Sequence, residues 1–198
     1  MARVKHTPII LLVALFALPF ILAYGLYWYG WRPGGTINHG ELVQPARPIA
    51  DAPLRTLEGR DIRFHDLRRK WVLVYFGSSQ CGEACERNLY KMRQVRLAQG
   101  KDADRILRVF LVTDTHTLDR LRPKLAQYPG MQVITGPAEN VKTLAQQFAL
   151  PAGSPLDGLE RIYVVDPSGN LMMSYPAGAD ASGVRKDLVR LLKVSQIG

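Results

Sequence analysis

The segment WVLVYFGSSQCGEAC, residues 71–85, decides the fold. Its start, Trp71 to Phe76, is an unbroken apolar run of β-branched and aromatic residues, typical of a strand buried on both faces. Gly77 to Gln80 then supply a turn. Beyond it, large apolar residues recur at near-helical spacing and predict a helix from Cys81 to Leu97. A buried strand therefore leads through a short turn into a helix that starts at a cysteine.

The rest of the chain continues this alternation of strands and helices. A short strand or hairpin is expected at 61–67, before the buried strand. After it, the expected elements are strands at 106–112 and 131–134, helices at 118–126, 138–148 and 182–194, and a closing hairpin of 161–166 with 171–175. This order predicts one α/β domain with a mixed sheet flanked by helices.

An apolar segment precedes the domain. Residues 7–31 contain no charged side chain and are long enough to cross a hydrocarbon core of about 30 Å as a helix. Pro19 is tolerated inside such a helix, and aromatic residues gather at its end, as they do at a membrane surface. The sequence therefore predicts a single transmembrane helix at 7–31.

The basic residues before this helix set its expected orientation. Arg3 and Lys5 favour a cytoplasmic N-terminus, residues 1–6, with the rest of the chain outside the cytoplasm. We expect 32–53, rich in proline and glycine, to be a linker or an extended arm packed on the domain, and 54–198 to be the domain itself. The expected location is the periplasmic side of a bacterial inner membrane, or the intermembrane space for a mitochondrial protein.

A cleaved signal peptide is the alternative for the same segment. The short basic start and the triplet Ala23-Tyr24-Gly25 fit that reading. The apolar run is longer than a usual signal core, however, and it continues into aromatic residues. We therefore prefer an uncleaved anchor.

Composition narrows the class of protein. The formal charge is +9, but the basic residues are spread along the chain without interleaved aromatics, so we expect no nucleic-acid partner. The chain has only two cysteines, Cys81 and Cys85. A single close pair is not the framework of a disulfide-stapled fold, so we interpret it as a site.

The cysteine spacing permits two kinds of chemistry. Residues four apart on a helix share one face, with Cβ atoms about 5–6 Å apart, so Cys81 and Cys85 can close a disulfide or grip one soft metal ion together. The start of a helix favours anionic sulfur and lowers a thiol pKa. Two thiolates suit Cu(I) better than a hard cation. Cys81 and Cys85 are thus the candidate catalytic residues and the candidate metal ligands.

A copper ion would normally seek a third ligand. We select His116 first, because it follows the C-terminal end of a central strand, where sites of α/β proteins gather. His39, in the expected linker, and His65, near the first short strand, are the alternatives. Each of these histidines is individually more typical of an exposed or capping residue.

Four segments carry a resemblance to a known family: KWVLVYFG at 70–77, CGEAC at 81–85, RVFLVTD at 108–114 and VVDPSG at 164–169. With them, residues 50–195 resemble the Sco/SenC family. The resemblance implies a membrane-anchored thioredoxin-like fold. It also implies help in assembling the dinuclear copper site of cytochrome c oxidase subunit II, as a copper donor, a thiol reductant or both.

The chain departs from the family at its copper site. The family's copper-binding histidine lies nine residues before the proline of the hairpin turn, a position held here by Gly158. The prolines that follow the cysteines in many members are replaced by Gly82 and Glu86. The usual coordination is therefore incomplete, whereas dithiol chemistry stays open.

Three functions follow from the sequence. The first is an accessory or assembly factor for cytochrome c oxidase that acts through dithiol–disulfide chemistry at Cys81 and Cys85, which would make it a thiol-disulfide oxidoreductase. The second is a Cu(I) chaperone with a substitute third ligand such as His116 or His39. The third is a non-catalytic scaffold for oxidase subunits or other assembly proteins.

Overall fold

The computed structural model describes residues 7–30, 37–158 and 160–195. The expected cytoplasmic residues 1–6 and the first part of the expected linker, 31–36, lie outside this part of the chain. The described residues fall into two units that divide after Ile37.

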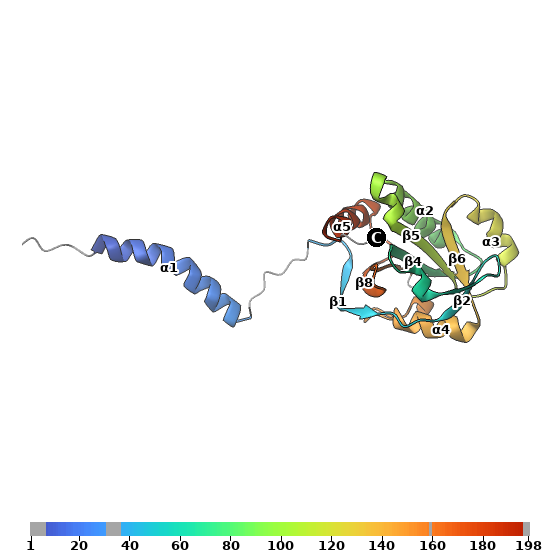
Figure 1. Ribbon diagram of the computed structural model, residues 1–198, viewed down its shortest axis with the longest axis horizontal. Helices are drawn as coiled ribbons and strands as arrows, with labels where there is room; N and C mark the ends of the chain where they lie inside the picture. The colour runs from blue at the N-terminus through green and yellow to red at the C-terminus, as the bar shows by residue number, and fades with distance from the viewer. Residues whose placement is uncertain (1–6, 31–36, 159, 196–198) are drawn as a thin grey trace, which may run out of the picture. The chain divides into compact units, whose positions relative to one another are not determined.

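The first unit is the helix α1, Thr7–Trp28, with Pro19 inside it (Figure 1). Its side chains are largely exposed, and none is buried. By length and composition it can cross a membrane. An apolar helix with no protein core to cover it is stable where lipid replaces water.

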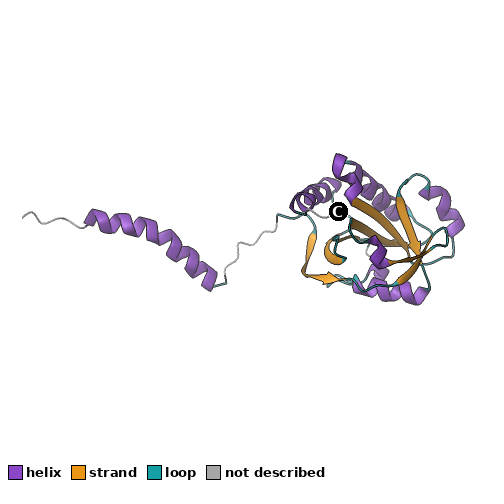
Figure 2. Ribbon diagram, viewed as in Figure 1, coloured by secondary structure: helices purple, strands orange, loops and turns teal. Residues whose placement is uncertain are grey.

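The second unit contains an eight-stranded mixed sheet (Figure 2). Its centre is β4, Trp71–Gly77, which pairs in parallel with β5, Ile106–Val112, and antiparallel with β7, Ile162–Val165. The strand order is β1-β8-β7-β4-β5-β6-β2-β3. The remaining strands are β1 (Glu41–Pro48), β2 (Pro53–Thr56), β3 (Asp61–Arg63), β6 (Met131–Thr135) and β8 (Asn170–Tyr175).

Helices cover both faces of this sheet (Figure 1). The helices α2 (Glu83–Leu97) and α5 (Ala181–Val194) pack on one face, and α4 (Ala138–Gln147) packs on the other. The short helix α3, Leu118–Leu125, adds Leu121 to the cluster under α2. Alternate residues of β4 enter opposite clusters, so the strand is buried on both faces as its sequence predicts.

The predicted α/β fold with a mixed sheet and flanking helices is confirmed, and most elements lie within one or two residues of the predicted bounds. Two strands, β1 and β2, were not predicted. β1 lies inside the segment 32–53 that we expected to be a linker or a packed arm, and it pairs with β8 at the edge of the sheet. Pro45 and Pro48 weaken the sequence signal for this strand. An edge strand nevertheless tolerates proline, because the backbone groups along its free side do not pair with another strand.

The short strand or hairpin predicted at 61–67 is confirmed in its first half, which pairs with β2, and wrong in its second half. Only Asp61–Arg63 is a strand, and Phe64–Leu67 forms a 3₁₀ turn. In that turn Phe64 and Leu67, three residues apart, point to the same side and are both buried. Burial of both side chains, which a straight strand would place on opposite faces, explains the change.

A substitution at Phe148 tests the packing of the core on the face of the sheet that α4 covers. Its fully buried ring lies 5.0 Å from the ring of Phe76 and 5.3 Å from that of Tyr163, between centroids. We expect Phe148→Ala to lower the free energy of unfolding by about 3–5 kcal/mol, because it leaves a cavity between rings. Urea denaturation measures this, with the exposed Tyr90→Ala as the control that changes it little.

Candidate functional site

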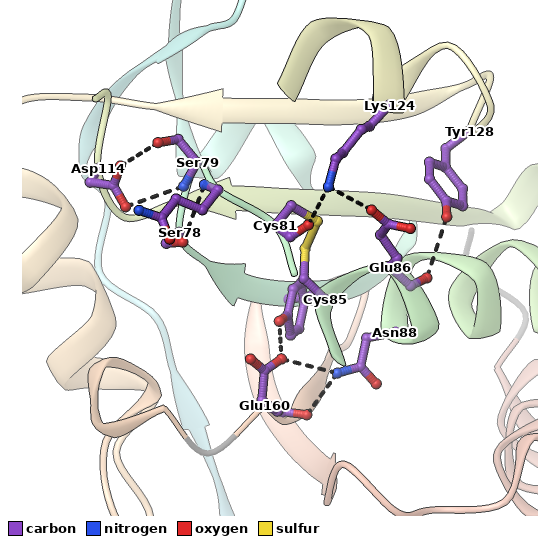
Figure 3. Close-up of a disulfide and its surroundings, with 12 residues drawn as sticks. Ser78, Ser79, Cys81, Cys85, Glu86, Asn88, Asp114, Lys124, Tyr128 and Glu160 are labelled. Atoms are coloured by element: carbon purple, nitrogen blue, oxygen red, sulfur yellow. Dashed lines mark hydrogen bonds and ion pairs between the residues drawn. A yellow bond between two sulfur atoms is a disulfide. The ribbon is translucent and has the colours of Figure 1, made fainter. Parts of the chain in front are cut away.

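The site is a disulfide between Cys81 and Cys85 at the junction of β4 and α2 (Figure 3). Their Cα atoms are 5.1 Å apart. The predicted helix start is wrong by two residues, because α2 begins at Glu83 with Gly82 as its N-cap. Cys81 therefore lies outside the helix, with a positive φ of 38° that is rare for a residue other than glycine. The sulfurs meet because Cys81 turns back toward the first turn of α2, rather than because both residues share a helical face.

Both cysteines are buried. Cys81 is 1% exposed and Cys85 is 4% exposed, and both belong to the apolar cluster under α2. A protein thiol cannot reach either sulfur while this segment stays closed. Exchange with a partner therefore requires the segment around Gln80 and Gly82, which are themselves exposed, to move outward.

Lys124 of α3 holds the Cys81 segment from one side (Figure 3). Its Nζ atom donates to the carbonyl oxygen of Cys81 at 2.7 Å and to the carboxylate of Glu86 at 2.6 Å. The hydroxyl of Tyr128 donates to the backbone oxygen of Glu86 at 3.3 Å, and burial, followed by the Glu86 charge, raises the pKa of Tyr128. These contacts place a cation beside the disulfide and join α3 to the first turn of α2.

Glu160 lies on the other side of Cys85 (Figure 3). Its carboxylate accepts a short hydrogen bond from the hydroxyl of Tyr75, and its backbone oxygen accepts from Asn88 at 3.0 Å. Burial, followed by this bond, raises the pKa of the Tyr75 hydroxyl well above its usual range. Glu160 also has a positive φ of 49°. Strained non-glycine residues collect at functional sites. Here one of them, Cys81, carries a sulfur of the disulfide, and another, Glu160, lies beside Cys85.

A polar cluster fixes the turn that leads to the cysteines. The hydroxyl of Ser79 donates to the carboxylate of Asp114, and its oxygen accepts from the backbone nitrogen of Thr117 at 3.0 Å. Burial opposes ionisation of Asp114, but hydrogen bonds from Ser79 and from the His116 backbone, with the His116 charge, outweigh it and lower the pKa of Asp114. The turn after β4 is thus tied to the turn after β5.

The structure does not gather the candidate histidines at the sulfurs. Among the described residues, no three side chains of His, Cys, Asp or Glu are grouped so as to hold a metal ion. His116 is exposed. The imidazole of His39 lies 3.2 Å from Asp187, and the backbone of His65 donates to Asp51 at 3.0 Å.

The sequence indicated the two cysteines but not Lys124, Glu160 or Tyr75 as their neighbours. A signal for Ser79 and Asp114 was present, because each follows the C-terminal end of one of two adjacent parallel strands. No local pattern marks Lys124, which reaches the site from another helix.

Residues 71–195 match the protein family described as transmembrane-like, thioredoxin-like, C-terminal domain. A putative copper-binding protein of Stutzerimonas stutzeri is 28% identical over 151 residues, covering 74% of this chain and 74% of that protein. The mitochondrial SCO2 homolog of Mus musculus is 28% identical over 120 residues, covering 57% of this chain and 46% of that protein.

Solved structures give the same fold. The crystal structure of yeast Sco1 with copper bound superposes with a TM-score of 0.64 at 18% identity, covering 77% of this chain and 96% of that one. At this identity the likeness shows a thioredoxin-like fold, which the sequence predicted.

Removal of the Lys124 contact should loosen the Cys81 segment. We expect Lys124→Met to speed reduction of the disulfide by a small phosphine about 5- to 10-fold, the equivalent of one lost hydrogen bond of about 1–1.4 kcal/mol. Thiol release measures the rate. Lys91→Met is the matched control, because Lys91 also donates to a backbone oxygen, that of Ala177 at 2.9 Å. Equal rates for the two variants would contradict the role of Lys124.

Asp114 should make the free energy of unfolding depend on pH in the acidic range. Its folded-state pKa is lowered from 3.8, so its contribution is complete well above that value and is lost as the pH falls through the folded pKa. We expect Asp114→Asn to cost about 1–2 kcal/mol near neutral pH, through broken hydrogen bonds to a charged group. The difference in the free energy of unfolding between variant and parent, measured by urea denaturation, should become smaller below about pH 4. A difference independent of pH would count against an ionised Asp114.

Proposed function

Because this chain belongs to the transmembrane-like, thioredoxin-like C-terminal domain family and is Sco/SenC-like, we propose that it is an accessory factor for maturation of the copper site of cytochrome c oxidase. It acts there through dithiol–disulfide chemistry at Cys81 and Cys85. The helix α1 anchors it in a bacterial inner membrane, with the domain on the periplasmic side. Its partners are oxidase subunits or other assembly proteins.

The observation that carries this proposal is the pairing of the two sulfurs at the end of the central strand. A site that forms a disulfide within five residues can pass two electrons and return to a closed state. The N-terminal end of α2 lies beside the sulfurs and favours an anionic thiolate. Lys124, whose charge is paired with Glu86, holds the Cys81 segment in its closed position. The polar cluster of Ser79 and Asp114 keeps the preceding turn in place.

The exchange proceeds in two balanced steps. In the reduced form, one thiolate attacks a disulfide of the partner protein, which forms a mixed disulfide and releases one partner thiolate. The second thiolate then attacks the mixed disulfide, which re-forms the Cys81–Cys85 bond and releases the second partner thiolate. Two electrons pass to the partner, whose two sulfurs are then free to take up copper. An external dithiol reductant returns the site to its reduced form.

Copper enters this scheme as cargo. Two thiolates at this separation suit a soft ion such as Cu(I), and relatives with copper-binding names and copper-bound structures support a copper-related role. No third side chain of the usual ligand types is gathered with the cysteines in the described part of the chain. A complete family-type coordination shell is therefore not supported, and the dithiol reaction fits the residues better.

A complementation experiment tests the proposal. We expect the double variant Cys81→Ser/Cys85→Ser to give membrane-bound oxidase activity and copper content no higher than a deletion strain does. Of the two single variants, Cys81→Ser and Cys85→Ser, the one that keeps the attacking thiol should accumulate a mixed disulfide with an oxidase or assembly protein, because the resolving thiol is missing. The exposed Tyr90→Ala is the control that restores full activity.

The same strains separate the alternatives. Full oxidase activity with the double serine variant would leave only a non-catalytic scaffold. Loss of activity without any trapped partner, together with a tight equimolar Cu(I) complex of the reduced protein, would favour a copper chaperone. In that case His116→Ala and His39→Ala identify the substitute third ligand through weaker Cu(I) binding.

A further inference from the structure

The outward face of α5 is basic. Arg185, Lys186, Arg190 and Lys193 are all exposed. The one acidic residue within the helix, Asp187, has a fully buried side chain. The N-cap residue Asp180 is exposed and offsets one of these charges at the start of the helix. The guanidinium of Arg190 lies 3.5 Å from the Asp187 carboxylate, which offsets its charge. Arg185, Lys186 and Lys193 still give the face that α5 presents to solvent an excess of positive charge.

The opposite face fixes this helix to the domain. Val184, Leu188 and Leu192 are at most 5% exposed and belong to the cluster under α2. The basic side chains consequently cannot turn inward without breaking the core. Their orientation toward solvent is a fixed property of the fold.

The chain enters the domain against this same helix. The buried carboxylate of Asp187 accepts from the backbone nitrogens of His39 at 2.8 Å and Gly40 at 3.0 Å, and from the hydroxyl of Tyr175 at 3.1 Å. The side chain of His39 packs on Gly183, where an added Cβ would lie 2.8 Å from the His39 Cβ. Where the chain enters the domain, His39 and Gly40 are thus bound to α5.

The length of the connection limits where α5 can go. In the sequence, His39 follows Trp28, the last residue of α1, by eleven positions. A fully extended chain advances at most about 3.5 Å per residue, so the connection spans at most about 40 Å. If α1 is a membrane anchor, this length of chain allows α5 to reach the membrane surface.

We propose that the basic face of α5, formed by Arg185, Lys186, Arg190 and Lys193, binds anionic phospholipid headgroups of the membrane that holds the chain. This inference rests on the proposed anchoring by α1. Basic residues near an anionic bilayer surface each favour contact by about fivefold, and the attraction falls off within a Debye length of about 8–10 Å. The short tether adds to it, because it raises the effective concentration of lipid at this face.

The test uses the full-length protein in lipid nanodiscs. Hydrogen exchange of 181–194 is compared between discs of phosphatidylcholine alone and discs that also contain phosphatidylglycerol. We expect slower exchange in the anionic discs and loss of this difference at high salt. In the variant Arg185→Gln/Lys186→Gln/Lys193→Gln, the ratio of docked to free domain should fall about 100-fold, since three favourable charges are lost.

A matched variant controls for net charge. Arg60→Gln/Lys70→Gln/Lys142→Gln removes the same charge from exposed residues of other elements. It should keep the slower exchange, and glutamine is tolerated in helices, so both variants are expected to fold. Equal loss of protection in the two variants would overturn the proposal, since the effect would then follow net charge alone.

Failure of the anchor and failure of the docking are distinguishable. Protein that does not enter either kind of disc contradicts the anchoring by α1. Protein that enters both, but exchanges equally fast in both along α5, overturns the lipid proposal and leaves the anchor intact. Slower exchange that appears only when a soluble acidic oxidase domain is added assigns the face to a protein partner and also overturns it.

Discussion

Burial of β4 on both of its faces is the constraint on which the rest of the molecule depends. Alternate side chains of Trp71–Gly77 enter the apolar clusters on opposite sides of the sheet. A strand of this kind cannot slip by one residue without moving every side chain to the wrong cluster. Its end is therefore fixed, and with it the turn that leads to Cys81. The helices α2 and α3 complete the site because they pack on one of these clusters.

The central part of this arrangement was predictable and the periphery was not. A continuous apolar run such as 71–76 has few alternatives to a central strand. Residues 106–112 are apolar except for Arg108 and favour the same interpretation. β1 and β2 escaped prediction because both contain proline, which weakens the sequence signal for a strand. β1 pairs with the distant strand β8, and β2 lies between the distant β6 and its sequence neighbour β3. An edge strand such as β1 depends on the sheet that it joins more than on its own composition.

The cysteine site shows the same division between local and distant causes. The four-residue spacing correctly predicted that Cys81 and Cys85 lie together. It also predicted that both lie on the helix, but Gly82 is the N-cap of α2 and Cys81 lies outside the helix. Glycine before two glutamates in a first turn is a recognisable start signal. Lys124 and Glu160 approach from other elements and left no sign in the local sequence.

The two edges of the sheet affect whether copies of the domain can pair with one another. One edge is β1, in which Pro45 and Pro48 remove backbone donors, and its pairing with β8 is interrupted between Leu42 and Arg47. The other edge is β3, only three residues long. Neither presents the long, regular row of free amides that recruits a foreign strand. The sheet of this domain is in this way protected from edge-to-edge pairing with the sheet of a second copy.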